Sequence, residues 1–361
     1  SLSRRKRKRK KMKIALLNDT HFGARGDSQL FFDYFIKFFD EVFFPYLKEN
    51  NINTVVHAGD FMDRRKYVNY NILNQVRKRF IAQLKEEEID FHCIIGNHDV
   101  YYRNTNEVNS LRELFFDDFT LYEEPTVVNF DGLDLALLPW INKTNYDKSI
   151  EFIKTASAPI LIGHLELNGY QVLHGIQYQG GNGMDPNLFN RYEQVYSGHF
   201  HCRQEKDNIY YLGTQYQITF ADLNDTKGFH VLDTDTRELE FIENPFKMFH
   251  TLSYNDKEGP IDIDSLDVSH LKDTYVKVFV ECKKHPYSFD QYMDKLYEVG
   301  VSKITVVEDM TEDEMTDEES VDLAQDTVTL INNEIDSMEE VEDKDKMKRL
   351  IKDLYMESLS L

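Results

Sequence analysis

The sequence predicts an α/β protein: a layered core of strands and helices, followed by a small α+β module and two helical patterns near the C-terminal end. Three observations favour this fold class. Between residues 12 and 99, short apolar runs alternate with longer helical patterns in the order β-α-β-α-β, which is typical of a layered α/β core. The first run is apolar throughout residues 14–17, as in a strand buried on both faces. At 361 residues and 41% hydrophobic content, the chain is long enough for a large core plus one or two smaller modules.

Each of the first three predicted strands ends in a polar cluster. The strands are expected over residues 12–18, 53–58 and 91–95. Between them, apolar residues at helical spacing predict a Phe-rich helix over 30–48 and a second helix over 71–88. The polar clusters that follow the strands are Asp19-Thr20-His21, Gly59-Asp60-Phe61-Met62-Asp63 and Gly96-Asn97-His98-Asp99.

A second set of strands is expected between residues 127 and 233. Asp131-Gly132 predicts a hairpin turn that joins strands over 127–130 and 133–138. A helix over 145–155 and a loop over 175–183 separate the later strands. These are expected over 159–162, 195–198, 209–212 and 228–233. Two of them end in histidines, in Gly163-His164 and in Gly198-His199-Phe200-His201.

Composition divides the chain into five parts. Residues 1–11, rich in Lys and Arg, read as a disordered basic arm or an expression remnant, and 12–246 as the catalytic domain. Residues 247–307 form an expected α+β module, with strands over 275–282 and 303–307 around a helix over 288–299. An acidic linker over 308–325 then leads to a helical tail, 326–361. The tail carries two apolar stripes, which either pack on the chain's own body or dock on a partner: Val328, Ile331 and Ile335, then Met347, Leu350, Ile351 and Leu354.

Charge and cysteine content indicate the cellular compartment of the protein. The net charge is −22, but the first eleven residues are strongly basic, so the rest is more acidic still. Three scattered cysteines indicate free thiols in a reducing compartment. No apolar run reaches the roughly 18 residues that a membrane span needs, and no signal peptide is evident. We therefore expect a cytoplasmic protein without a membrane partner.

The polar side chains at five strand ends predict one site. In open α/β sheets, ligands bind beyond the carboxyl ends of the strands, so these groups can converge. Imidazole, carboxylate and amide groups together suit two borderline divalent cations, and a carboxylate from the Gly-Asp turn could bridge them. Two such ions clamp a phosphate and a hydroxide. The predicted set comprises Asp19, His21, Asp60, Asn97, His98, His164, His199 and His201.

In this order, the motifs D-x-H, G-D-x-x-D, G-N-H-D, G-H and G-H-x-H resemble the calcineurin-like metallophosphoesterase superfamily. The length, the module after Pro245 and the helical tail are similar to the SbcD-type nuclease subunit of DNA double-strand-break repair, particularly its phage recombination-endonuclease branch. The resemblance implies a two-sheet metallophosphoesterase sandwich flanked by helices, with the small module as a DNA-binding cap.

The resemblance also implies a role for each residue. Asp19, His21 and His201 would hold the first metal, Asp60 would bridge, and Asn97, His164 and His199 would hold the second. His98 would act on the scissile phosphate, oriented by Asp99. Asp63 stands where some relatives place a substrate-steering histidine, and we expect it to hydrogen-bond a ligand from outside the site. His57 is the other expected supporting residue.

Two divalent ions, manganese with magnesium as the alternative, are the implied cofactors. The implied partners are DNA ends, double-stranded, single-stranded or hairpin, an SbcC-type coiled-coil ATPase and a second copy of the chain. If the chain is encoded by a phage, its setting is the cytoplasm of the bacterial host. Two alternatives remain: a stand-alone phosphomonoesterase or cyclic-nucleotide phosphodiesterase, and an inert scaffold that keeps the fold.

Overall fold

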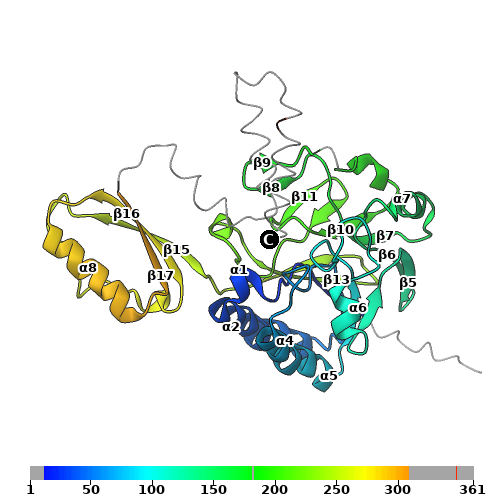
Figure 1. Cartoon of the computed structure of the whole chain (residues 1–361), viewed down its shortest axis with the longest axis horizontal. Helices are drawn as coiled ribbons and strands as arrows, with labels where there is room; N and C mark the ends of the chain where they lie inside the picture. Colours follow the sequence, from blue (N-terminus) through cyan, green and yellow to red (C-terminus); the bar gives the residue numbers. More distant parts are fainter. Residues whose placement is uncertain (1–11, 181–182, 309–346, 348–361) are drawn as a thin grey trace, which may run out of the picture. The chain divides into compact units, whose positions relative to one another are not determined.

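The computed structural model describes residues 12–180, 183–308 and 347, and the chain divides into two compact units, Ser1–Met248 and Phe249–Leu361 (Figure 1). The first unit contains two six-stranded sheets and the second a three-stranded sheet. The α/β class predicted from the alternating pattern is confirmed. Among the described residues, no helix is both long and apolar enough to cross a membrane.

The first sheet has the order β14-β13-β1-β2-β3-β4. The strands β1 to β4 run parallel to one another, and β13 pairs antiparallel with β1. The carboxyl ends of β1 to β4 therefore meet at one edge, as the sequence predicted for β1, β2 and β3. The bounds are β1 Lys13–Leu17, β2 Thr54–His57, β3 Asp90–Ile94, β4 Thr120–Tyr122, β13 Gly228–Asp233 and β14 Leu239–Glu243.

The second sheet has the order β11-β12-β10-β7-β6-β5. The three strands β6, β7 and β10 are parallel, and β5 closes one edge as the predicted hairpin with β6. The bounds are β5 Thr126–Phe130, β6 Leu133–Leu138, β7 Ile160–His164, β10 Gln194–Gly198, β11 Gln204–Lys206 and β12 Ile209–Tyr211. A separate small hairpin, β8 Gln171–Leu173 with β9 Ile176–Gln177, occupies part of the segment expected to be a loop.

The two sheets share one apolar core. Ile14 and Leu16 of β1 contribute to the same buried cluster as Ile160 and Ile162 of β7. The intervening Leu161 belongs to a different cluster on the outer face of the second sheet, together with Ile153 of helix α7, Tyr146–Thr155. Alternate residues thus serve opposite apolar faces, which explains the continuous apolar runs at 14–17 and 160–162.

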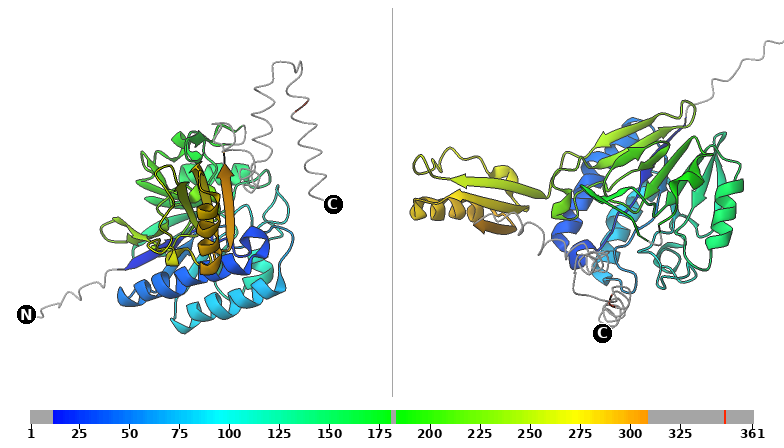
Figure 2. Two further views of the ribbon diagram at one scale, coloured as in Figure 1. Left: turned by 90° about the vertical axis from the view of Figure 1, so that its left-hand side faces the viewer. Right: turned by 90° about the horizontal axis from the view of Figure 1, so that it is seen from above.

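Two helical segments cover the outside of the first sheet and lie side by side (Figure 2, left, blue). The first runs through α2 Gln29–Phe38, η1 Phe39–Phe43 and α3 Phe44–Glu49, and the second through α4 Tyr70–Val76, η2 Arg77–Ile81 and α5 Ala82–Glu86. Each begins at a polar cap: Ser28 accepts from the N–H of Phe31, and Asn69 accepts from the N–H of Ile72. Between them they bury most of the Phe-rich face that the sequence predicted.

Shorter elements complete the first unit. They are α1 Ala24–Asp27, α6 Ser110–Phe115, η3 Pro186–Phe189 and η4 Phe220–Asp222. The strand expected over 159–162 extends to His164, so this histidine ends a strand instead of following one. The strand β14 was not predicted, because its sequence Leu-Glu-Phe-Ile-Glu is half polar and it lies at the sheet edge.

The second unit is a parallel sheet in the order β15-β16-β17 with one crossover helix, α8 Pro286–Val299. Its strands are β15 Phe249–Asn255, β16 Tyr275–Cys282 and β17 Lys303–Glu308, and η5 covers Ser269–Leu271. Tyr254, Val278 and Leu296 lie in its own buried core. Of the predicted tail positions, only Met347 is described, as an exposed helical residue. The others lie outside the described residues: Val328, Ile331, Ile335, Leu350, Ile351 and Leu354.

Candidate metal centre

The structure brings the predicted ligands together at the carboxyl ends of β1, β2, β3, β7 and β10. Three close groups of donor atoms form there, and within each group the atoms lie within 4.8 Å of one another. The groups are Asp19 with His21 and His201, then His21 with Asp60 and His98, then Asp60 with His164 and His199. Asp60 and His21 each belong to two groups, so the three groups form one continuous centre.

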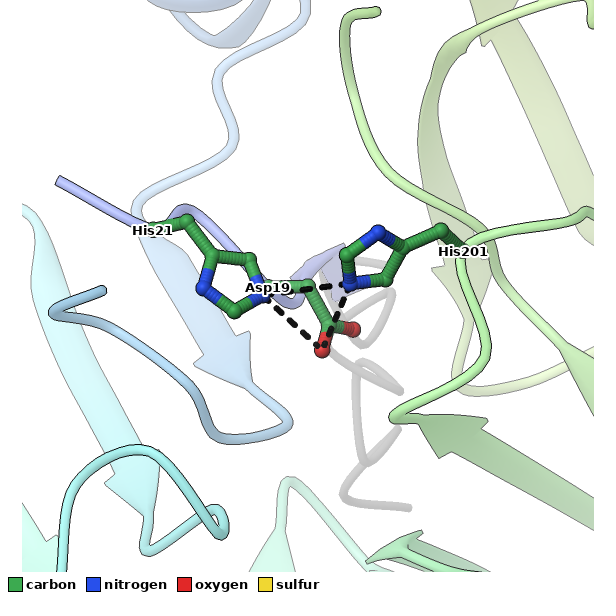
Figure 3. A group of neighbouring side chains, drawn as sticks. All are labelled: Asp19, His21 and His201. Atoms are coloured by element: carbon green, nitrogen blue, oxygen red, sulfur yellow. Dashed lines mark hydrogen bonds and ion pairs between the residues drawn. The ribbon is translucent and has the colours of Figure 1, made fainter. Parts of the chain in front are cut away.

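Asp19, His21 and His201 form the first group (Figure 3). Asp19 and His21 come from the segment after β1, and His201 from the loop after β10, 180 residues further along the chain. The Nε2 atoms of the two histidines are 3.1 Å apart. Oδ1 of Asp19 lies 3.8 Å from Nε2 of His21 and 4.0 Å from Nε2 of His201. Two imidazole nitrogens and one carboxylate oxygen therefore converge on a common point.

Asn97, His164 and His199 form a second convergence. Oδ1 of Asn97 lies 2.8 Å from Nε2 of His164 and 2.8 Å from Nδ1 of His199. The other nitrogen of His164, Nδ1, lies 2.7 Å from the carbonyl of Ala58 and donates to it. In the neutral ring this leaves Nε2 as an acceptor that faces further acceptors, an arrangement that a cation stabilises.

Asp60 stands between the two groups. Its Oδ2 is 3.3 Å from Nε2 of His164 and 3.8 Å from Nε2 of His21. Its Oδ1 accepts from the backbone N–H of His98 at 2.7 Å. Oδ2 is buried and has no hydrogen-bond donor among the described residues. A buried carboxylate oxygen between two imidazole groups fits a bridging ligand for two cations, so the residues present fit a two-metal centre.

At His21 and His164 the electrostatics favour bound positive charge. Burial lowers the pKa of His21 and of His164, but neighbouring carboxylates outweigh it and raise both values to about 9. For His21 the largest opposing cause is the hydrogen bond with Asp63, and for His164 it is the charge of Asp60. Burial raises the pKa of Asp60, yet the charges of His164 and His98 hold it well below its usual range. The negative charge that attracts protons here equally attracts metal ions.

Four of the predicted ligands have left-handed backbone conformations. The φ angles are 47° at Asp19, 43° at His21, 58° at Asp60 and 88° at His199. Such angles are uncommon outside glycine and cost free energy, of the order of 1–3 kcal/mol each. Their concentration at one centre indicates that the fold is held in this arrangement to position these side chains.

Two glycines permit the close approach of the loops. A Cβ on Gly96 would lie 2.2 Å from Oδ1 of Asp60, and a Cβ on Gly198 would lie 2.8 Å from Oδ2 of Asp19. Any side chain at either position would displace a predicted ligand. The glycines of the G-N-H-D and G-H-x-H motifs are therefore steric requirements of the centre.

His98 projects its ring beside the first group. Its ring centroid is 4.7 Å from that of His21, edge to face. Its Nδ1 contacts the backbone carbonyl of Asp63, and its Nε2 is buried without a hydrogen-bond partner among the described residues. Because Nδ1 is engaged by the carbonyl, Nε2 is the atom available to a bound substrate.

Among the described residues the Asp99 carboxylate accepts hydrogen bonds from backbone N–H groups, whereas the resemblance implied that it orients His98. Its Oδ2 accepts from the backbone N–H of Gly96 and of Asp60, both at 2.8 Å, and its Oδ1 accepts from Phe61 and Met62 at 3.0 and 3.3 Å. The Asp99 side chain therefore points back between two loops, where it fixes the Gly-Asp turn. The Asp63 carbonyl holds the His98 ring instead.

Asp63 and His57, the two expected supporting residues, contact different residues of the segment after β1. A carboxylate oxygen of Asp63 lies 3.2 Å from Nδ1 of His21, as a partner that orients a metal-binding ring does. His57 lies 3.1 Å from the hydroxyl of Thr20, which sits between Asp19 and His21. Burial lowers the pKa of His57 to about 3, so its ring is neutral.

Sequence reasoning missed three residues around the centre. Asn18 donates to Oδ2 of Asp19 at 2.6 Å, and Lys227 donates to the carbonyl of His201 at 3.0 Å. Trp140, the one tryptophan of the chain, lies 5.2 Å from the ring of His199 between centroids. The position of Trp140 just after the predicted strand over 133–138 was the available signal, since strand ends carry the other site residues.

A further donor group lies beside the centre, formed by His174, Cys202 and Asp225. Burial raises the pKa of the Cys202 thiol to about 12, which opposes the thiolate that a metal needs. Lys227 lies 3.0 Å from a carboxylate oxygen of Asp225 and so supplies positive charge already. We interpret this group as a structural contact that joins the β8–β9 hairpin to the chain after β12.

Known proteins resemble this chain along most of its length. A family model described as calcineurin-like phosphoesterase matches residues 12–203. Exonuclease subunit 1 of Enterobacteria phage T4 is 32% identical over 352 residues, which cover 96% of this chain and 99% of the phage protein. An SbcCD nuclease subunit of Staphylococcus epidermidis is 24% identical over 315 residues, which cover 74% of this chain and 82% of that protein. These similarities confirm the resemblance inferred from the motifs.

Proposed function

Because this chain belongs to the calcineurin-like phosphoesterase family, we propose that it cleaves phosphodiester bonds of DNA as a metal-dependent nuclease. The observation that carries the proposal is the carboxylate of Asp60, buried between two groups of nitrogen and oxygen donors. Two of the similar proteins are named as nuclease subunits, which supports DNA as the substrate.

In this proposal each predicted ligand is assigned to one ion or to both. Asp19, His21 and His201 would hold one ion, Asn97, His164 and His199 would hold the other, and Asp60 would contact both. When bound, the ions supply Lewis-acid charge to the phosphate and lower the pKa of a bound water. Asp63 keeps the His21 ring in position, and the Asp63 carbonyl fixes that of His98. Nε2 of His98 would then contact the phosphate, and it would give a proton to the leaving oxygen only from the doubly protonated ring, because Nδ1–H already donates to the Asp63 carbonyl.

We assign manganese as the working ion. Magnesium prefers a nearly octahedral set of oxygen ligands with several waters, whereas this centre offers at least four imidazole nitrogens. Imidazole with carboxylate and amide oxygen suits manganese and its transition-metal neighbours better. Metal analysis after dialysis against equal concentrations of the two ions tests this assignment.

The partner we propose is an SbcC-type coiled-coil ATPase, with the chain acting as a homodimer in the bacterial cytoplasm. The similarity to an SbcCD nuclease subunit over 74% of the chain supports it. We assign docking to the C-terminal segment, 326–361, for which the sequence predicts two helices, and DNA contact to the small module, 247–307. Deleting the chain from Asp322 should abolish co-purification with the ATPase and leave hydrolysis of a small phosphodiester intact. Unchanged binding of the ATPase would remove the tail from the docking role.

The activity is tested by a comparison of substrates. Purified protein with Mn²⁺ should degrade linear DNA, in the absence and presence of the ATPase, and hydrolyse p-nitrophenyl phosphate far more slowly. The His98→Ala variant serves as the inactive control for contaminating nucleases. Preference for the phosphomonoester would favour a stand-alone phosphatase. Absence of both activities in metal-loaded protein would favour an inert scaffold.

A further inference from the structure

Two loops that carry predicted ligands continue into a basic and aromatic surface. After Asp60 and Asp63, the first loop carries Arg64, Arg65, Lys66 and Tyr67; after Asn97 and Asp99, the second carries Tyr101, Tyr102 and Arg103. The side chain of Tyr67 is 74% exposed, that of Tyr102 52% and that of Tyr101 38%. Three exposed tyrosines on the loops beside a candidate active centre mark a candidate binding surface.

The two loops lie against each other. Nζ of Lys66 is 5.7 Å from the ring centroid of Tyr101, and the rings of Tyr101 and Tyr102 are 4.7 Å apart, edge to face. The second loop is anchored, because the N–H of Tyr101 donates to Val108 at 2.9 Å and Asn106 donates to the carbonyl of Trp140 at 3.0 Å. The tyrosine rings are therefore held on a fixed backbone.

Arg65 is the link between this surface and the metal centre. Its charge interacts with Asp60 and with the ring of His199, and burial together with the charge of Arg103 lowers its pKa. Its Nη1 is buried without a hydrogen-bond partner among the described residues. A guanidinium keeps its proton at any ordinary pH, so Arg65 remains a poorly paired cation at the edge of the centre.

The neighbouring Arg64, unlike Arg65, has a close carboxylate partner among the described residues. Its Nη1 lies 3.1 Å from a carboxylate oxygen of Asp27, so its charge is paired within the chain. Within the part of the chain that the structure describes, Arg65, Lys66 and Arg103 form no ion pair of this kind. Three cations without close carboxylates, in a chain with net charge −22, favour an anionic ligand at this place.

We propose that Arg65, Lys66, Arg103 and the tyrosines 67, 101 and 102 form a platform for an unpaired DNA strand that leads into the metal centre. This inference rests on the proposed nuclease function and names its substrate. Arg65 binds a phosphate at or next to the scissile bond, Lys66 and Arg103 bind the following phosphates, and the tyrosine rings stack on bases. Stacking needs a free face of the base, which a strand offers only where its bases are unpaired.

The platform is tested with full-length protein, Mn²⁺ and three substrates: single-stranded oligo(dT), blunt duplex DNA and bis(p-nitrophenyl) phosphate. For Arg65→Ala we expect the ratio of kcat/KM on oligo(dT) to kcat/KM on the small diester to fall at least tenfold. Arg64→Ala is the matched control and should leave this ratio unchanged, because the charge of Arg64 is already paired with Asp27. A ratio that stays constant in Arg65→Ala would overturn the role of Arg65.

The stacking role is tested at the tyrosines. Tyr101→Ala and Tyr102→Ala should each raise the KM for oligo(dT) roughly tenfold, whereas Tyr101→Phe and Tyr102→Phe keep the ring and should restore it. In salt titrations of oligo(dT) binding, Lys66→Ala and Arg103→Ala should each reduce the slope of log K against log salt by about 0.7. Because all four side chains are exposed, the variants should fold, and thermal unfolding checks this.

The outcomes separate the two proposals. If the wild-type protein hydrolyses the small diester but no DNA, the proposed function fails. If the wild-type protein degrades DNA and the alanine variants lose activity equally on duplex and single-stranded substrates, the surface binds duplex and the platform for an unpaired strand is refuted. If it degrades DNA and the variants lose nothing, the platform alone is refuted.

Discussion

The rings of Phe22 and Phe61 lie 5.2 Å apart between centroids, edge to face, and each residue directly follows a predicted metal ligand. Both side chains are fully buried. The backbone beside them is paired, because the N–H of His21 donates to Asp60 at 3.1 Å and that of Phe22 to Phe61 at 3.0 Å. The buried aromatic rings next to His21 and Asp60 therefore help to hold the backbone of these two residues in position.

Replacing Phe61 by Ala should weaken both the fold and the metal centre. Loss of a buried Phe typically costs about 3–5 kcal/mol, because apolar burial is lost and a cavity remains. We expect a decrease of that size in the free energy of unfolding, measured with urea, and weaker Mn²⁺ binding by calorimetry. Phe116→Ala is the control, since Phe116 is 66% exposed and should change stability by no more than about 0.5 kcal/mol.

The Asp60→Asn variant should lose both metals. The amide retains one oxygen, and its NH2 group would face the imidazoles where the carboxylate now supplies negative charge. We expect bound Mn²⁺, measured by elemental analysis after gel filtration, to fall from two ions per chain to less than one, with no hydrolysis. Asp134→Asn, remote in the β5–β6 hairpin, should retain two. If Asp60→Asn kept both ions, Asp60 would not bridge.

The His98→Ala variant should keep both metals and lose turnover. In the structure the ring is held by the Asp63 carbonyl, and its Nε2 has no other described partner. Removal of a group that transfers a proton or stabilises charge typically costs 10²–10⁴-fold in rate. Single-turnover rates at saturating Mn²⁺, measured beside metal content, separate chemistry from binding. Loss of the ions in this variant would place His98 among the ligands.

The sequence was informative where local pattern and chemistry coincide. Strands such as β1 and β7 are buried on two faces, so their apolar runs identify them. The convergence of side chains at the candidate metal centre could be predicted because polar residues of suitable types lie at the carboxyl ends of the five strands β1, β2, β3, β7 and β10. The left-handed backbone at Asp60 and the inward turn of Asp99 could not, because both depend on contacts between distant loops. The edge strand β14 was missed because only one of its faces needs to be apolar.

A pH-dependent contribution to stability should arise at His230 on β13. Burial, followed by the charge of Arg203, lowers its pKa to about 3, whereas an unfolded histidine titrates near 6.5. The unfolded state therefore binds an extra proton below about pH 6.5, and stability falls as the pH decreases from there towards 3. This group alone should cost about 2 kcal/mol between pH 7 and pH 5.

The His230→Phe variant should remove that contribution, since no proton is then taken up at this position. Urea unfolding of metal-free protein at pH 5, 6 and 7 measures the difference in slope from the wild-type chain. Some acid sensitivity should remain, because burial also lowers the pKa of His57 to about 3. An identical pH dependence in the variant would show that His230 is accessible to protons in the folded state.

Asp99→Asn should separate two possible roles of this carboxylate. Its oxygens accept from four backbone N–H groups, those of Gly96, Asp60, Phe61 and Met62, and so join the loops after β2 and β3. The amide of Asn would present N–H groups to two of these donors, and buried N–H groups without acceptors cost about 1–3 kcal/mol each.

We therefore expect Asp99→Asn to lower the free energy of unfolding by about 2–4 kcal/mol and to weaken Mn²⁺ binding, because the turn that carries Asp60 loosens. Asp40→Asn is the matched control: its carboxylate pairs with Arg79, both side chains are about two-fifths exposed, and the pair should contribute less than about 1 kcal/mol. The rival role, orientation of His98, predicts normal stability and metal content with reduced turnover. Calorimetric metal titration and urea unfolding of the same preparation decide between them.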